Sequence, residues 1–409
     1  MKKINFLVIN MIVSLSLILG VSQSNIISAE EETFGTYWTS DSEPAKQLKE
    51  YVEKLTNPND KENFIEEKDR IAVFDMDGTL TCETYYTYYD TMMFIEYCLN
   101  DHPERVSNEL KQIAASIKPG YTADESLARN FAKAYAGMTV EEFKEYAAEF
   151  GKKKTDSFNN MRYSEGFYLP MVELVKYLYD NGFTVYVISG TERTTTRAIV
   201  ENSPIKDYVT PNHVIGTDFE VKEKGYENVS SNMDYKYADG DELVLTGGFV
   251  QKNLNANKAI YIEREIGQRP VLAFGNSGSD TSMMNYTIDS RNPHPAEVYM
   301  VVADDNVREW GKQNWDEKSK EYKEKGYIPI SMANDFAKIY SDNISKADQQ
   351  YIEKEPVVAP NTSTTLEDLI PLMYPTTVQY HFVQLPNLLM FAIVGFKQGV
   401  IRDLFAAGR

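Results

Sequence analysis

The sequence predicts an α/β protein built on a three-layer, Rossmann-like parallel sheet. Short apolar runs rich in β-branched and aromatic residues recur at 71–74, 184–191, 271–274 and 298–302. Amphipathic stretches expected to be helices, at 169–181, 192–200 and 257–266, separate them. Continuous apolar runs are typical of strands buried on both faces. Strands that alternate with helices imply crossover connections, and therefore a parallel sheet.

The first 29 residues have the pattern of a secretory signal. Lys2 and Lys3 precede an apolar run at about 4–21, and small residues ending at Ala29 precede Glu30. We therefore expect a secreted or cell-envelope protein, with an uncleaved membrane anchor as the alternative. Residues 30–70 are expected to form a polar N-terminal arm with one helix near 44–55.

The chain is strongly acidic. Its formal net charge is −19, and removal of the two signal lysines would take it to −21. Such a surface repels nucleic acid and anionic lipid, so we expect no nucleic-acid partner. An anionic substrate would need a nearby cation and a few placed hydrogen-bond donors.

The first strand ends in two carboxylates, Asp75 and Asp77, followed by Gly78. Side chains two residues apart on an extended chain point the same way, so both carboxylates can address one substrate atom. One could attack while the other handles a proton. A calcium loop would need Gly and Glu where Leu80 and Tyr86 stand, so that alternative is rejected. A strand that merely ends in a polar turn remains the plain alternative.

Two insertions interrupt the expected core, which spans 71–345. The first, at about 84–165, is helical throughout, with helices expected at 85–99, 102–117, 123–135 and 140–150. The second, at about 209–250, has short alternating runs and an Asp239-Gly240 turn signal, which predict a small β-hairpin.

The end of the chain, at 346–409, differs in composition. A Pro/Ser/Thr-rich linker precedes an apolar segment at 385–405 that is too short to span a bilayer. It would form either a helix docked on the main domain or an interfacial segment with weak membrane contact. Cys82 and Cys98 are the two cysteines of the chain, and their places beside the candidate site and on an expected helix favour free thiols.

Polar groups also follow the later strands. Ser189-Gly190-Thr191 ends the second strand, Lys258 lies on a helix, and Gly275-Asn276-Ser277-Gly278-Ser279-Asp280 follows the third. With Asp75-Met76-Asp77-Gly78-Thr79, these segments resemble, in order, the four motifs of the haloacid dehalogenase-like (HAD) hydrolase superfamily. Lys258 stands seventeen residues before Gly275, a spacing similar to that of the phosphoserine-phosphatase-like branch. The resemblance covers about residues 70–310.

The resemblance implies a residue-by-residue mechanism. Asp75 resembles the nucleophile that forms an aspartyl-phosphate, and Asp77 resembles the general acid and base. Ser189, Gly190 and Lys258 resemble the phosphate-binding groups. A Mg²⁺ ion is implied, with ligands from Asp75, Asp77 and the fourth motif. Carbon–halogen hydrolases of the superfamily lack the second Asp, so its presence here favours phosphate chemistry.

The fourth motif departs from the family pattern at one position. Asn276 stands where many relatives have Asp, so either Asp280 supplies the metal's anionic ligand or metal binding is weak. The fourth motif also partly resembles that of secreted phosphorylcholine phosphatases, while the first motif differs at Gly78. Tyrosines 85, 86, 88 and 89 would line the pocket or form the core of the cap. Arg193 and Arg197 would reach an anionic substrate or form ordinary ion pairs.

These observations predict a secreted, Mg²⁺-dependent phosphomonoesterase that acts on a small phosphorylated metabolite. Its core would be the α/β sheet, with a helical cap and a β-hairpin as inserts. The alternatives are a catalytically weak envelope binding protein of the same fold, or a phosphotransferase or mutase.

Overall fold

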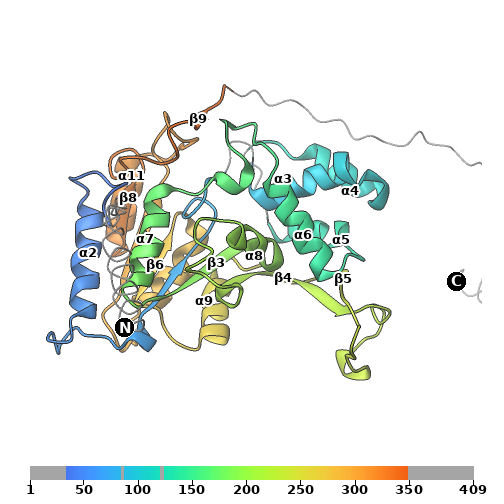
Figure 1. Cartoon of the computed structure of the whole chain (residues 1–409), viewed down its shortest axis with the longest axis horizontal. Coiled ribbons are helices and arrows are strands. Elements are labelled where there is room, and N and C mark those ends of the chain that lie inside the picture. The colour runs from blue at the N-terminus through green and yellow to red at the C-terminus, as the bar shows by residue number, and fades with distance from the viewer. Residues whose placement is uncertain (1–33, 84–86, 120–123, 349–409) are drawn as a thin grey trace, which may run out of the picture. The chain divides into compact units, whose positions relative to one another are not determined.

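A seven-stranded sheet forms the centre of the structure (Figure 1). The computed structural model describes residues 34–83, 87–119 and 124–348. The chain divides into two units, residues 1–356 and 357–409, and the second unit lies outside the described residues. In spatial order the strands are β5 (Leu243–Gln251), β4 (Val214–Glu223), β3 (Thr184–Glu192), β1 (Ile71–Phe74), β6 (Leu272–Gly275), β7 (Glu297–Val302) and β8 (Ile328–Ser331).

Most of the sheet is parallel. The central strand β1 pairs in parallel with β3 on one side and β6 on the other. The pairs β6–β7, β7–β8 and β3–β4 are also parallel, and only β4–β5 is antiparallel among the pairs of this sheet. The predicted α/β fold with a parallel, Rossmann-like sheet is therefore confirmed.

The sheet is covered on both faces, as its apolar strands require. Alternate side chains of β1 enter two separate hydrophobic clusters: Ala72 and Phe74 enter one, and Ile71 and Val73 enter the other. Side chains of α2 (Glu43–Thr56), α7 (Leu169–Asp180) and α8 (Arg193–Glu201) fill the first cluster. Side chains of α9 (Ala256–Tyr261), α10 (Thr281–Thr287) and α11 (Trp315–Glu324) fill the second. The architecture thus has three layers.

The first insertion contains four α-helices in its described part, namely α3 (Tyr89–Glu96), α4 (Asn108–Ser116), α5 (Glu125–Ala134) and α6 (Val140–Gly151). Three of them begin later than the sequence predicted, α5 by two residues and α3 and α4 by more. The helix α3 begins at Tyr89 and passes into a π-helical turn at Tyr97–Asp101. The helix α4 begins at Asn108 because the Ser107 hydroxyl accepts the Leu110 amide at 3.2 Å and acts as its N-cap. Residues before Ser107 instead form a short 3₁₀ turn that contains Pro103.

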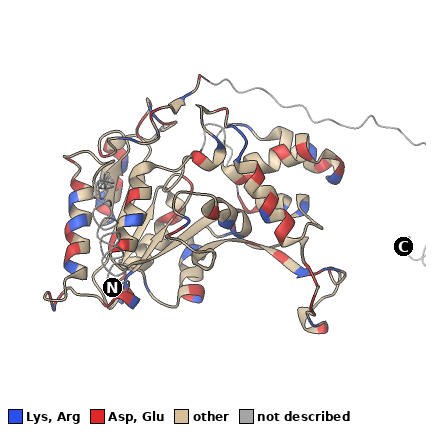
Figure 2. Cartoon of the chain, viewed as in Figure 1, with Lys and Arg blue, Asp and Glu red and all other residues tan. Residues whose placement is uncertain are grey.

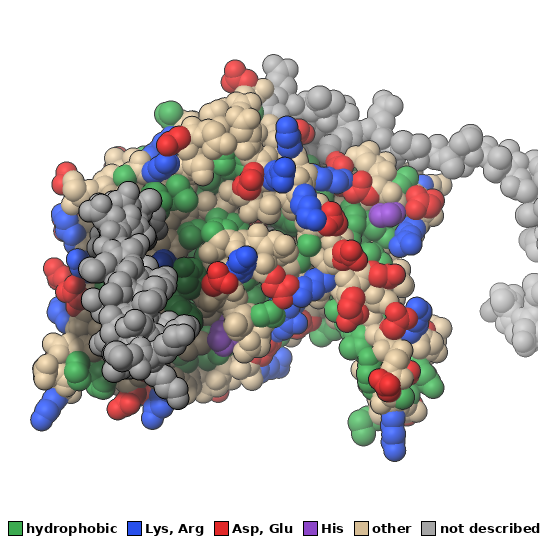
Figure 3. Space-filling model, in the orientation of Figure 1, with side chains coloured by type: hydrophobic (Ala, Val, Ile, Leu, Met, Phe, Trp, Pro, Cys, Tyr) green, Lys and Arg blue, Asp and Glu red, His purple; other side chains and the backbone are tan. Residues whose placement is uncertain are grey.

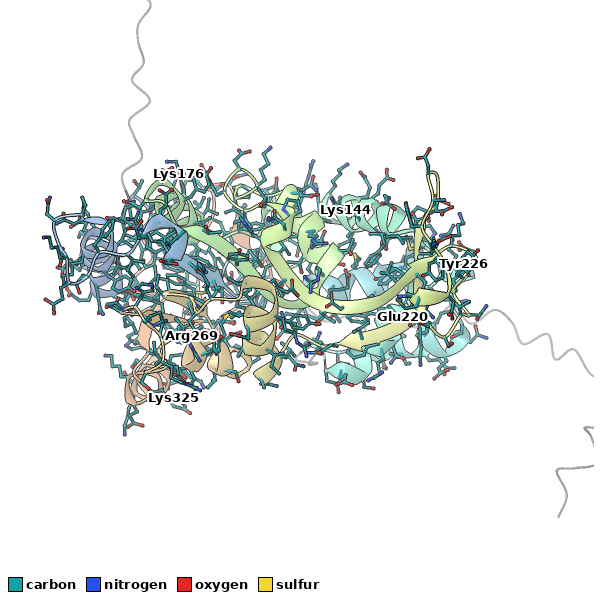
Figure 4. The ribbon with its side chains drawn as sticks, turned by 90° about the horizontal axis from the view of Figure 1, so that it is seen from below. Lys144, Lys176, Glu220, Tyr226, Arg269 and Lys325 are labelled. Atoms are coloured by element: carbon teal, nitrogen blue, oxygen red, sulfur yellow. The ribbon has the colours of Figure 1, made fainter. Side chains whose placement is uncertain are left out.

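The helical insertion packs against β5 and against the helix α8. The helix α6 contacts α8, and α5 contacts β5. Lys144 of α6, labelled in Figure 4, pairs with Glu201 at the end of α8 at 2.5 Å. The loop between α5 and α6 also bonds to β5, because the Gly137 amide donates to the Leu245 carbonyl at 2.8 Å.

The predicted hairpin exists as β4 and β5, but it is not a detached insert. The first part of β4 is a strand of the main sheet, since Val214 and Ile215 pair in parallel with Val187 and Ile188 of β3. Beyond that pairing β4 and β5 extend past the other strands, as the position of Glu220 shows in Figure 4. The apolar start of β4 explains this arrangement, because these side chains are buried in the core.

The segment before β1 is part of the folded core. Leu48, Val52 and Leu55 of α2 are buried with the first cluster, and the Tyr51 hydroxyl donates to the Val271 carbonyl at 2.9 Å. The edge strand β8 was not predicted, because its run of four residues contains Pro329. Cys82 and Cys98 are both buried, and neither forms a disulfide, as expected. None of the helices in the described residues is long and apolar enough to cross a membrane; the predicted signal and C-terminal segments lie outside them.

Candidate active site

A cavity of about 300 Å³ lies at the carboxyl ends of the central strands, where open α/β sheets place their ligands. The first strand contributes Asp75, and the loop after β6 contributes Asn276. The described residues that line the cavity are Asp75, Asp77, Glu83, Tyr88, Asp90, Gly190, Thr191, Lys252, Leu254, Asn276, Ser277 and Ser279. The predicted strand-end groups therefore do meet at one place.

The Asp75 carboxylate is buried and held from two sides. Its Oδ1 accepts a hydrogen bond from the Lys258 ammonium at 2.5 Å, and its Oδ2 accepts one from the Thr79 hydroxyl at 3.2 Å. Burial and the neighbouring Asp280 raise the pKa of Asp75 to about 7, against the opposing effect of Lys258. Since Asp75 also lines the cavity, its Oδ2 can approach a substrate atom.

Lys258 lies behind the cavity wall and joins two carboxylates. It is fully buried, and its ammonium donates to Asp75 and, at 2.6 Å, to Asp280. Burial alone would lower the pKa of Lys258, but the carboxylates of Asp280 and Asp75 raise it above its usual value. The ammonium therefore stays charged and fixes the orientation of Asp75.

Asp280 is also a structural anchor. Its Oδ2 accepts hydrogen bonds from the backbone amides of Asn276 at 3.1 Å and Ser277 at 3.0 Å, while its Oδ1 accepts from Lys258. Both oxygens are thus already engaged within the protein. Asp280 holds the loop after β6 in place, and it is not among the described residues that line the cavity.

Asp77 lies two residues after Asp75 and accepts a hydrogen bond from the end of β3. The Thr191 hydroxyl donates to the Asp77 Oδ2 at 2.9 Å. Burial, and then the carboxylates of Asp90 and Asp75, raise the pKa of Asp77 well above its usual value. A carboxyl group that keeps its proton in this way is suited to donate it to a leaving group.

The tip of β3 is packed tightly behind the cavity. The Ser189 hydroxyl is fully buried and accepts the Thr191 amide at 3.0 Å. Gly190 lines the cavity, and a Cβ there would lie 2.5 Å from a methyl group of Leu254. The structure therefore brings Gly190 to the cavity surface, whereas Ser189 and Lys258 lie behind it.

Asn276 forms a hydrogen bond with Glu83, an acid that lies outside the four motifs. Its amide Nδ2 donates to Glu83 Oε1 at 2.8 Å, so its own oxygen is left for another partner. Burial raises the pKa of Glu83 to about 7, with Asn276 opposing and Asp75 adding to the shift. Glu83 thus brings a carboxyl group next to the side chain at position 276.

The donor set suits a hard divalent cation. Four carboxyl groups, those of Asp75, Asp77, Glu83 and Asp90, line one small cavity, and this excess of acid favours a bound cation. Among the described residues, no three His, Cys, Asp or Glu side chains converge as a complete metal cluster. A Mg²⁺ ion would therefore also need the Asn276 amide oxygen, a backbone carbonyl and water, which are ligands that Mg²⁺ accepts.

Three charged residues of the cavity were missed by the sequence analysis, namely Glu83, Asp90 and Lys252. Asp90 comes from the helical insertion and Lys252 from the end of the hairpin, and no local pattern marks either one. Of the tyrosines after the first motif, Tyr88 lines the cavity and Tyr89 is buried against Phe150; residues 85 and 86 lie outside the described chain.

Arg193 does not lie in the cavity. Its guanidinium pairs with Asp218 at 2.7 Å and with Glu265 at 2.6 Å, so it forms ordinary ion pairs. Arg197 donates to the Pro211 carbonyl at 2.9 Å. On the face in Figure 3, basic and acidic side chains are interspersed, and Figure 2 shows the same mixture along the ribbon. Attraction of an anion therefore depends on groups inside the cavity.

Comparison with known proteins decides the family. The model of the haloacid dehalogenase-like hydrolase family matches residues 72–285, which contain every strand-end group described above. The chain belongs to this family. The predictions of the HAD superfamily and of a HAD-type hydrolytic enzyme are therefore confirmed. None of the curated proteins compared with the chain matches it.

Several solved structures are similar to this HAD protein at low identity. A conserved protein of unknown function from Anaerococcus prevotii DSM 20548 is 13% identical, with a TM-score of 0.44, and the match covers 75% of this chain and 97% of that one. A phosphoserine phosphohydrolase-like protein from Francisella tularensis subsp. tularensis SCHU S4 is 16% identical, with a TM-score of 0.31 and coverage of 57% and 87%. A HAD family hydrolase from Salmonella enterica serovar Typhi is 12% identical, with a TM-score of 0.34 and coverage of 66% and 69%. The family assignment rests on the family model and not on these likenesses.

Proposed function

We propose that this HAD hydrolase is a phosphomonoesterase that acts on a small organic phosphate through an aspartyl-phosphate intermediate. The observation that supports the proposal best is the arrangement around Asp75. The buried Lys258 holds one oxygen of this carboxylate, and Asp75 itself lines the cavity. Asp77, whose raised pKa favours the protonated form, lies two residues further on.

The first step is a transfer of the phosphoryl group to Asp75. Its Oδ2 attacks phosphorus while the ester P–O bond breaks, and Asp77 gives its proton to the departing oxygen. Lys258 holds Asp75 in the attacking orientation. Gly190, Thr191 and Ser277 line the cavity wall beside which the phosphate would lie.

The second step is hydrolysis of the intermediate. Asp77, now a carboxylate, takes a proton from water, and the water oxygen attacks phosphorus. The bond from phosphorus to the Asp75 oxygen breaks, which releases phosphate and restores both carboxyl groups. The raised pKa of Asp77 suits it to donate a proton in the first step and to accept one in the second.

We also propose Mg²⁺ as the cofactor, with ligands from Asp75, Asp77 and Asn276 and with Glu83 as a further acid. The other candidate acid, Asp280, already accepts hydrogen bonds from Lys258 and two backbone amides and would hold the loop instead. The ion would neutralise the repulsion between the phosphate and the cavity's carboxylates. HAD hydrolases generally use this ion. Secretion after removal of residues 1–29 is proposed on the signal pattern, and the small cavity supports a small phosphorylated metabolite as substrate.

The proposal is tested with 4-nitrophenyl phosphate and two variants. The wild type should release phosphate with Mg²⁺ and stop when a chelator is added. Asp75→Asn should abolish turnover. Asp77→Asn should release about one equivalent of nitrophenol in a burst and then stall, because nitrophenol leaves without a proton whereas the hydrolytic step still needs the Asp77 base.

Controls of folding and of the intermediate, together with the fate of the phosphate, decide the outcome. Circular dichroism should show both variants folded like the wild type, and acid-quenched Asp77→Asn should carry one phosphoryl group by mass spectrometry. Retained turnover in Asp75→Asn would exclude the covalent route. Transfer of phosphate to added glycerol in place of water would identify a phosphotransferase, and folded wild type without any phosphate release would identify a binding protein.

A further inference from the structure

Lys252 is a buried lysine whose ammonium has no direct partner among the residues that the structure describes. It follows β5 directly, it is only 7% exposed, and it is the one cationic side chain among the described residues that line the cavity. Its ammonium makes no hydrogen bond and no ion pair within the described part of the chain. A buried charge without a partner is unfavourable, so its retention beside a cavity points to a ligand.

Two other buried lysines of this protein have hydrogen-bond acceptors for their ammonium groups. Lys222 of β4 is 9% exposed, and its ammonium donates to the carbonyls of Glu227 at 3.1 Å and Val229 at 2.7 Å. Lys258 is fully buried and donates to two carboxylates. Lys252 has a comparable burial but neither kind of acceptor.

The main chain around Lys252 is fixed relative to the end of β3. The Asn257 side chain donates to the Lys252 carbonyl at 2.7 Å. The next residue, Asn253, donates from its side chain to the Ser189 carbonyl at 3.0 Å and from its amide to the Thr217 hydroxyl at 3.1 Å. Lys252 is therefore held in a set position beside the proposed phosphate site.

Burial lowers the pKa of Lys252, and the carboxylates of Asp90, Asp77 and Asp124 oppose that shift. Asp90 belongs to α3 and Asp124 precedes α5, so Lys252 is influenced by acids of the helical insertion as well as by Asp77. Asp90 is beyond ion-pair distance, and its Oδ1 accepts the Thr91 hydroxyl at 3.1 Å. The reacting carboxylate Asp75 has its own lysine, so Lys252 is available for a different part of the substrate.

We propose that Lys252 binds a second anionic group of the substrate, so that the preferred substrates are small phosphate monoesters that also carry a carboxylate or a second phosphate. This inference rests on the proposed phosphomonoesterase activity. A cavity of about 300 Å³ limits such a substrate to a few carbon atoms between its two anionic groups. Four acids and a single cationic side chain are among the described residues that line the cavity, so a second anion is most favoured beside Lys252.

The test compares two matched pairs of substrates with the full-length mature protein. The first pair is 3-phosphoglycerate and glycerol 3-phosphate, which differ by a carboxylate in place of a hydroxymethyl group. The second pair is propane-1,3-diol bisphosphate and its monophosphate. In at least one pair the ester with the second anion should have a kcat/KM roughly tenfold higher, as expected for one charge-assisted hydrogen bond. The pair that shows the preference identifies the second anion as carboxylate or phosphate.

The variants test whether Lys252 causes the preference. Lys252→Met should lower the ratio of kcat/KM within the preferred pair by about tenfold, mainly through a higher KM for the more anionic ester, and Lys252→Arg should restore much of it. Lys222→Met is the matched control, because it removes an equally buried lysine of the same hairpin and should leave the ratio unchanged.

Different outcomes contradict different claims. An equal loss of kcat/KM for both members of a pair in Lys252→Met, or a wild type that prefers the less anionic esters, would overturn the inference and make Lys252 a counter-charge for Asp90. A wild type that releases phosphate from 4-nitrophenyl phosphate but from none of the four esters would overturn the inference alone. One that releases phosphate from none of the five esters would overturn the proposed function as well.

Discussion

At the scale of single residues, the site depends on how buried charges are paired. Lys258 holds Asp75 and Asp280 together, and Asn276 bonds to Glu83. The amide at position 276 is compatible with this arrangement because it donates to a neighbouring carboxyl group. An Asp there would instead place two acids side by side, which a metal ion would have to offset.

Asn276→Asp is therefore expected to tighten Mg²⁺ binding, by roughly tenfold, because the added charge attracts the cation more strongly than an amide oxygen does. Isothermal titration calorimetry of the folded variant and wild type at neutral pH measures this directly. The same substitution should destabilise the metal-free protein, since Glu83 loses its donor and gains a like charge. Weaker Mg²⁺ binding by the variant would contradict the assignment of position 276 as a ligand.

At the scale of elements, the turn after β1 determines the position of Asp77. Gly78 has φ = +82°, and its amide donates to the Thr81 carbonyl at 2.7 Å. A Cβ on Gly78 would lie 1.9 Å from Asn276 Nδ2 and 2.6 Å from Glu83 Oε1. Glycine is thus required by its backbone conformation and by the side chains packed over it.

Gly78→Ala should cost at least about 1 kcal/mol of unfolding free energy and should also lower kcat/KM, because it displaces Asn276 and Glu83. Gly225→Ala is the control. Gly225 also has a positive φ, of +91°, but nothing lies within 4 Å of a Cβ there, so this variant measures the backbone cost alone. Urea unfolding and steady-state kinetics give both quantities. Equal stability losses in the two variants, with unchanged activity in both, would show that the turn tolerates a side chain.

At the scale of the whole described unit, distant chain segments are joined around a buried carboxyl group. The Tyr340 hydroxyl donates to Glu309 Oε2, and the Trp310 amide donates to Glu309 Oε1 at 2.7 Å. The Trp310 indole donates to the Ser157 carbonyl at 2.9 Å. Burial raises the pKa of Glu309 to about 7. This group therefore links the stability of the fold to pH.

The sign of that linkage follows from the raised pKa. Between the usual carboxyl pKa and about 7, the folded protein binds more protons at Glu309 than the unfolded chain does, so stability falls as pH rises through this range. The shift corresponds to roughly 3 kcal/mol. Glu309→Gln, which stays neutral, should lose less unfolding free energy than the wild type between pH 5 and pH 8.

Urea unfolding of Glu309→Gln and wild type at the two pH values measures this difference. Glu324→Gln is the control, since that side chain is 67% exposed at the end of α11 and should leave the pH dependence unchanged. Parallel pH dependences for Glu309→Gln and the wild type would mean that Glu309 is ionised in the folded protein at neutral pH.

The sequence by itself determined the central strands and the groups at their ends. Apolar runs ending in Asp75, Ser189 and Asn276 predict both the sheet and the meeting of these residues, because the carboxyl ends of neighbouring parallel strands lie at one edge. Helix limits were less well predicted where caps or turns decide them, as at Ser107, and the short strand β8 was missed.

Only the tertiary structure decided which other groups complete the cavity. Glu83, Asp90 and Lys252 come from the turn after β1, from the helical insertion and from the hairpin, and they meet through packing between segments far apart in the chain. No periodic pattern encodes that packing. The tertiary structure therefore decided which charged groups surround the cavity, whereas the local sequence of the central strands already predicted the position of Asp75 at its edge.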